Sequence, residues 1–197
     1  MRHRLTLAAV LGVALAAAVV TALPARRDPD TSTNGRLQLV ASNAGDNKPM
    51  VSNSLDGRAI FTIVGLQPGQ SRSGQVTVKN AGSAPETVAV WQSGLTSGPA
   101  GRPNLAAWAQ LTVYDAALKK AVYAGAYQNF PTLPSPLLLC GIPSGNGKDP
   151  CPKWAKGETH VFTFTVAFPD VPKGSAVNIN TYQSTRLQSE FDWVSAI

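Results

Sequence analysis

The feature of this sequence that most constrains its fold is a series of short runs in which apolar and polar residues alternate. In the run 58–66, Phe61 and Ile63 fall on the opposite side from Thr62, and the turn residues of "GLQPGQ" end the run. A period of two residues indicates a β-strand with one buried face and one wet face. The chain is therefore expected to fold mainly as antiparallel sheet.

Alternating runs of this kind continue to the C-terminal end of the sequence. They cover residues 36–41, 58–66, 73–80, 86–92, 110–116, 120–125, 159–168 and 186–194. Residues 104–110 are the one stretch with the character of a helical turn or two. About eight strands without a long helix predict an all-β fold, a two-sheet antiparallel sandwich of the jelly-roll kind.

The N-terminus predicts export. A basic start at Arg2 and Arg4 is followed by an apolar run from Leu5 to Leu23, and small residues follow as far as Ala25. This order is that of a secretory signal peptide, here residues 1–25. The alternative is an uncleaved anchor, because the run is close to the roughly 20 residues that cross a bilayer; Pro24 and the polar stretch after it favour cleavage. Any membrane contact is expected through this segment alone.

The mature chain divides into a short tail and one domain. Residues 26–35, "RRDPDTSTNG", carry no apolar side chain and are expected to be flexible. Residues 36–197 have the size of a single domain. The first strand places Leu37 and Leu39 on one face, so it either closes its own sheet or pairs with the sheet edge of a neighbouring molecule.

The two cysteines also fit an exported protein. Cys140 and Cys151 bracket a loop rich in Gly and Pro, and a disulfide is expected in an oxidising compartment. A zinc site would need further Cys or His ligands close by. Residues 140–151 are therefore predicted to form a cystine-closed loop.

The charges give no sign of nucleic-acid binding. The formal net charge is +6, but the basic residues are scattered rather than clustered with aromatic side chains. A mild attraction to anionic cell-wall polymers is the most that this charge implies. We expect no nucleic-acid partner.

The sequence contains no recognisable catalytic motif. His160 is the single histidine after the signal segment, and with Glu158 it is at most a fragment of a zinc or serine-hydrolase site. We expect His160 to be a surface residue at a strand edge, and Glu190 and Asp192 to be solvated on a polar strand face. The prediction is a protein that is not an enzyme and has no cofactor, catalytic residue or metal ligand.

The tryptophans raise a carbohydrate-binding module as an alternative. Trp193 is in phase with Leu187 and Phe191 and belongs to the core. Trp91 lies opposite its apolar neighbours, and Trp154 lies beside the cystine loop. Trp91 and Trp154 are therefore the candidate exposed aromatics for stacking on a sugar.

Four stretches carry a resemblance to a known family. They are "AIFTIVGLQPGQSRSGQVTVKNAGS" (59–83), "LTVYDAALKKAVYAG" (111–125), "WAKGETHVFTFTVAFPD" (154–170) and "NINTYQSTRLQSEFDWV" (178–194). In order and spacing they resemble the TasA/camelysin family of secreted bacterial β-sandwich proteins, with departures at Ala81, at Ser184 and in the cystine loop.

The resemblance implies two functions, a fibre subunit of extracellular matrix or biofilm and a camelysin-like cell-surface metalloprotease. Because the protease motif is missing, the sequence favours a secreted or cell-surface structural protein. Its partners are expected to be copies of itself or other matrix and cell-wall components.

Overall fold

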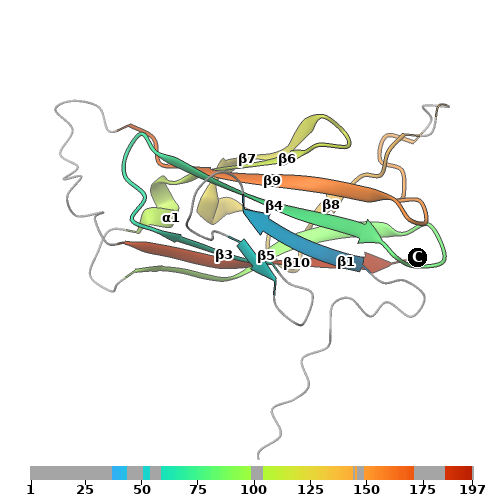
Figure 1. Cartoon of the computed structure of the whole chain (residues 1–197), viewed down its shortest axis with the longest axis horizontal. Helices are drawn as coiled ribbons and strands as arrows, with labels where there is room; N and C mark the ends of the chain where they lie inside the picture. The colour runs from blue at the N-terminus through green and yellow to red at the C-terminus, as the bar shows by residue number, and fades with distance from the viewer. Residues whose placement is uncertain are drawn as a thin grey trace, which may run out of the picture.

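A computed structural model describes residues 37–43, 51–53, 59–98, 104–143, 145, 149–170 and 185–196 of the chain. The predicted signal segment 1–25 and the predicted tail 26–35 lie outside these residues. The described part consists of two five-stranded antiparallel sheets packed face to face, so the predicted all-β sandwich is confirmed (Figure 1).

The first sheet, sheet A, has the strand order β1-β4-β9-β6-β7. Its strands are β1 (Leu37–Asn43), β4 (Ser71–Asn80), β9 (Thr159–Ala167), β6 (Gln110–Asp115) and β7 (Lys120–Ala126). Sheet B has the order β2-β3-β10-β5-β8. Its strands are β2 (Val51–Asn53), β3 (Ala59–Val64), β10 (Arg186–Ala196), β5 (Thr87–Gly98) and β8 (Leu137–Leu139).

All eight predicted runs form strands, and two strands of three residues, β2 and β8, were not predicted. Three residues are too few to show a period of two, so pattern reading misses them. The predicted helical turn is present as α1 (Leu105–Trp108), and a single 3-10 turn, η1 (Tyr127–Asn129), follows β7.

The core lies between the sheets and is filled from both inner faces. Phe61 packs against Phe164 and Phe191 with ring centroids 4.5 and 4.8 Å apart, and Phe130 stacks edge-on to Phe191 at 5.0 Å. Trp193 is 1% exposed, as its phase in the sequence predicts. Aromatic pairs in these geometries stabilise a core beyond the area that they bury.

The turn quoted above, between β3 and β4, depends on two glycines with positive φ. Gly65 has φ +64° and Gly69 has φ +78°, a region that strains residues with a side chain. Gly69 N–H donates to the carbonyl of Phe168 at 2.8 Å, which ties the turn to the end of β9. The "GLQPGQ" turn therefore fixes the connection between β3 and β4.

Candidate functional site

The densest group of ionisable side chains in the described residues surrounds His160. This residue is the second of β9, where alternation turns His160, Phe162 and Phe164 toward the core. The ring is 0% exposed and stacks on Trp154 with centroids 3.9 Å apart. The expectation of a surface histidine was wrong, because Trp154 covers the ring and a strand pattern does not show what a distant loop will cover.

Both ring nitrogens of His160 face carboxylates. Nδ1 lies 2.7 Å from Oδ2 of Asp115, and Nε2 lies 2.8 Å from Oε1 of Glu158. Ionised carboxylates accept hydrogen bonds but do not donate them, so the ring satisfies both only as the doubly protonated imidazolium. Burial alone lowers the pKa of His160, but the hydrogen bonds and negative charges of Asp115 and Glu158 outweigh burial and raise the pKa above its ordinary value of 6.5.

Asp115 connects the histidine to the hairpin between β6 and β7. Its second oxygen, Oδ1, accepts hydrogen bonds from the backbone N–H groups of Ala117 and Leu118 at 2.9 and 3.2 Å. The side chain thus caps the turn and pairs with His160 at the same time. An Asp at the start of a turn is common, and from sequence alone it reads as turn chemistry.

Glu158 connects the histidine to two loops. Its Oε1 also accepts from the backbone N–H of Ile142 at 2.6 Å, and its Oε2 accepts from that of Ala155 at 2.6 Å. Ile142 belongs to the cystine loop, and Ala155 follows Trp154. We call His160, Asp115, Glu158 and Trp154 the histidine cluster; it joins sheet A to both loops at one end of the sandwich.

The geometry of the histidine cluster suits a structural role better than a chemical one. A general base or a metal ligand needs a ring nitrogen with a free lone pair, and here each nitrogen is bonded to a carboxylate. Within the described part of the chain, no three His, Cys, Asp or Glu side chains come together in a way suited to a metal ion. The histidine cluster is a buried charge network that fixes loops.

Trp154 closes the same end of the sandwich. Its backbone N–H and C=O exchange hydrogen bonds with Glu86 at 2.8 and 2.9 Å, and its indole N–H donates to the carbonyl of Leu139 at 3.0 Å. The side chain is 0% exposed, so Trp154 is not an exposed aromatic as the sequence suggested. A single tryptophan in a loop has no periodicity from which its burial could be read.

Glu86 and Asn80 extend the polar character of this end. The Asn80 side-chain amide donates to the carbonyls of Ala84, Trp154 and Ala155 at 3.0–3.2 Å. Glu86 is 0% exposed, and neither of its carboxylate oxygens has a hydrogen-bond partner among the residues that the structure describes. A buried acid without a partner destabilises a fold.

The remaining aromatics divide between half-buried and exposed. Trp91 is half-buried, between the buried residues Val90 and Gln92 of β5. Trp108, at the end of α1, is 46% exposed, and Tyr114 of β6 is 41% exposed. Neither residue was predicted as an exposed aromatic, although Tyr114 follows the alternation of β6, in which Leu111 and Val113 are buried.

The two acidic residues of β10 also differ from expectation. Asp192 is 4% exposed rather than solvated, and its carboxylate accepts a hydrogen bond from the Ser93 hydroxyl. Glu190 is half-buried. Both lie in a central strand of sheet B, where neighbouring side chains cover more of each residue than at an edge.

The predicted disulfide is confirmed. Cys140 and Cys151 are bonded, with Cα atoms 4.6 Å apart. A hydrogen bond within the loop stabilises it further: the Cys151 N–H donates to the Asp149 carboxylate at 2.9 Å. Gly141 N–H also donates to the carbonyl of Pro152 at 2.7 Å.

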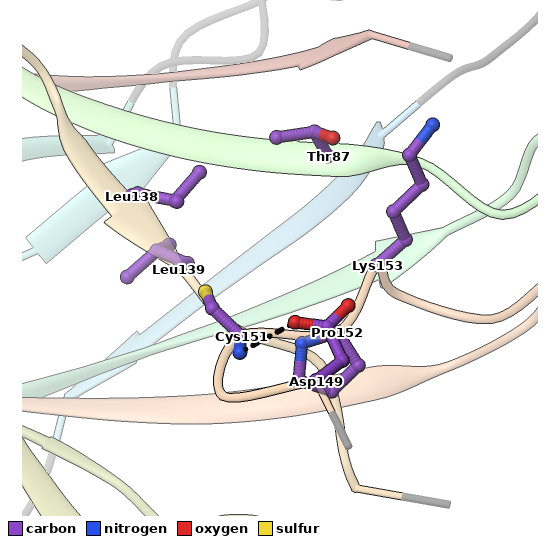
Figure 2. A pocket seen from close by; sticks show the side chains of 7 residues that line it. All are labelled: Thr87, Leu138, Leu139, Asp149, Cys151, Pro152 and Lys153. Carbon is purple, nitrogen blue, oxygen red and sulfur yellow. Dashed lines mark hydrogen bonds between the residues drawn. The ribbon is translucent and has the colours of Figure 1, made fainter.

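A small pocket lies between this loop, β8 and the start of β5 (Figure 2). It has a volume of about 200 Å³ and is lined by Thr87, Leu138, Leu139, Asp149, Cys151, Pro152 and Lys153. Ligand pockets usually hold about 300–1,000 Å³, so this one is too small to enclose a drug-sized ligand.

The candidate strand-exchange segment is β1, at the edge of sheet A. Leu37 is 3% exposed, and it lies opposite Asn80 of β4. Leu39 lies opposite Val78 in the same ladder. In this molecule β1 therefore completes its own sheet.

Searches for relatives leave the family open. No protein-family model matches the chain, and no characterised protein matches it significantly. The resemblance to the TasA/camelysin family remains a prediction. Among the described residues, no helix is both long and apolar enough to span a bilayer.

Proposed function

We propose that this protein is an exported structural component of the cell surface or extracellular matrix, and that its copies associate by exchanging β1. The observation that carries the proposal is the position of β1. It is the first described strand of the chain, and it pairs along one side, with β4, through seven residue pairs from Leu37–Asn80 to Asn43–Gly74.

A strand in this position can be replaced by its equivalent from another molecule. Release of β1 would uncover the hydrogen-bonding edge of β4 and a place in the core for Leu37. The β1 of a second copy has the same sequence and makes the same ladder, so exchange loses no contact. Reciprocal exchange between two copies would give a closed dimer, whereas a strand passed head to tail from each subunit to the next gives an open filament. We propose the head-to-tail form.

Two further features support export and an extracellular setting. The Cys140–Cys151 bond belongs to an oxidising compartment. The N-terminal sequence has the order of a secretory signal. In the histidine cluster both ring nitrogens of His160 are hydrogen-bonded to carboxylates. This arrangement favours a structural function over the camelysin-like protease.

The first experiment compares residues 26–197 with a shortened protein, residues 42–197, by size-exclusion chromatography and electron microscopy at high concentration. The longer protein should form filaments, and the shortened one should stay monomeric. A longer protein that is monomeric at every concentration would refute the proposal.

Cysteine crosslinking tests exchange without relying on a truncated fold. Val40 and Thr77 are opposite each other in the β1–β4 ladder. Val40→Cys and Thr77→Cys, made in separate molecules and mixed, should give a disulfide-linked dimer only if β1 of one molecule pairs with β4 of the other. Val40→Cys mixed with Thr163→Cys is the control, since Thr163 lies on β9, beyond β4. Equal crosslinking in both mixtures would show random contact.

A further inference from the structure

On the outer face of sheet A, the three middle strands β4, β9 and β6 present mostly polar side chains and little charge. Strands alternate, so the residues between buried positions point outward. The polar and aromatic residues at these outward positions are Ser71, Ser73, Gln75 and Thr77 of β4, Thr159, Thr163 and Thr165 of β9, and Gln110, Thr112 and Tyr114 of β6. Lys79, at the end of β4, is the charged residue among the outward positions of these three strands.

The sheet register aligns these side chains in rows across the strands. Thr163 lies between Gln75 and Tyr114, and Thr165 lies between Ser73 and Thr112. Adjacent strands are about 4.8 Å apart, so the row from Gln75 to Tyr114 spans roughly 10 Å. The face therefore presents a fixed array rather than scattered polar groups.

Hydrogen bonds within the rows hold several of these side chains in place. Gln75 Nε2 donates to Thr163 Oγ1 at 3.2 Å. The hydroxyls of Ser73 and Thr165 are bonded at 2.9 Å. Side chains that are already ordered lose less conformational entropy when a ligand binds.

Gln75 and Thr163 can still form further hydrogen bonds to a ligand. Gln75 uses one of its two amide protons in the contact with Thr163, and the amide has a second proton to donate. The Thr163 hydroxyl accepts from Gln75 and still has its own proton to donate. This row can therefore both donate to and accept from a ligand.

Tyr114 gives the row an aromatic surface. Its side chain is 41% exposed, and its neighbours across the sheet are the smaller residues Thr163 on β9 and Ala121 on β7. These smaller neighbours leave the Tyr114 ring accessible to a ligand. Next to it, Ala124 of β7 lies opposite Thr112.

We propose that this face binds a neutral, extended, β-linked polysaccharide. The C–H face of one sugar packs on the Tyr114 ring, and hydroxyls of the adjoining sugar bond to Thr163 and Gln75. Sugar hydroxyls donate and accept, as these side chains do. Nucleic acid or an anionic glycan would call for clustered cations, which these rows lack. This binding site goes beyond self-association through β1.

The test is sedimentation of residues 26–197 with insoluble cellulose and with chitin, at 0.15 and 0.5 M NaCl. The protein should bind at least one of the two polysaccharides, with little change between the two salt concentrations, because the site is uncharged. Tyr114→Ala should weaken binding roughly tenfold, which corresponds to about 1.4 kcal/mol.

Trp108→Ala is the matched control, because Trp108 is also an exposed aromatic (46%) but belongs to α1 rather than to the rows. It should bind like the unchanged protein. The proposal would be overturned if the protein bound neither cellulose nor chitin, or if binding were lost at 0.5 M NaCl. It would also be overturned if Tyr114→Ala and Trp108→Ala lost binding equally. Circular dichroism of each variant checks that it is folded. Tyr114→Ala should form filaments like the unchanged protein, so the two proposals are tested separately.

Discussion

Replacing His160 with glutamine is expected to destabilise the protein strongly. The change keeps a polar side chain but removes a buried positive charge from between two carboxylates. Asp115 is 1% exposed and Glu158 is 7% exposed at the side chain. Neither can recover full hydration while the fold is intact.

The size of the effect follows from the distances. With contacts of 2.7 and 2.8 Å, each carboxylate oxygen lies about 4 Å from the centre of the imidazolium charge, and such a pair is worth about 4 kcal/mol at an effective dielectric constant near 20. The cost of burying the histidine offsets much of this attraction. Removing one partner of a buried ion pair typically costs about 3–5 kcal/mol, and we expect His160→Gln to fall in that range.

The assay is denaturant unfolding of residues 26–197 at pH 7, with thermal unfolding beside it. For a chain of this size, a loss of 3–5 kcal/mol lowers Tm by roughly 10 °C. The control is the variant His160→Gln with Asp115→Asn and Glu158→Gln, in which all three charges are absent. It should recover part of the loss, since no unpaired charge is then buried.

The pH dependence gives an independent check. Because the folded pKa of His160 is raised, its stabilising contribution is complete below the unfolded pKa near 6.5 and is lost as pH rises through the folded value. The difference in unfolding free energy between the unchanged protein and His160→Gln should therefore be largest near pH 6 and shrink at alkaline pH. A loss below 1 kcal/mol, or a difference that grows with pH, would refute the reasoning.

Three further predictions concern the same end of the sandwich. Cys140→Ser with Cys151→Ser should lower the unfolding free energy by up to about 3 kcal/mol, while circular dichroism still shows a folded sandwich; an unfolded variant would contradict this. Glu86→Met should raise the unfolding free energy by about 1–3 kcal/mol, because it removes a buried acid without a hydrogen bond; a clear loss in urea unfolding would mean that Glu86 has a partner. Trp154→Ala should cost about 3–5 kcal/mol through the cavity that it leaves, measured by thermal unfolding, whereas Trp108→Ala should change stability by less than about 0.5 kcal/mol.

Eight of the ten described strands, and the apolar face of several of them, could be predicted from the sequence itself. The alternation in β10 places Trp193 in phase with Leu187 and Phe191, and all three are buried. A strand has only two faces, so once one face is apolar the orientation of each residue follows locally. The disulfide could also be predicted, since the chain has two cysteines and they flank a short loop.

The order of the strands, and with it the histidine cluster, was decided by the tertiary structure. Asp115 lies 45 residues before His160 in the chain, and it reaches the ring only because β6 pairs with β9. Trp154 is buried because the loop before β9 folds over the end of the sandwich, and nothing in the sequence next to it encodes that path. Alternation specifies which face of a strand is wet or dry, but it does not specify which strand lies beside it, because that choice depends on the packing of the whole core.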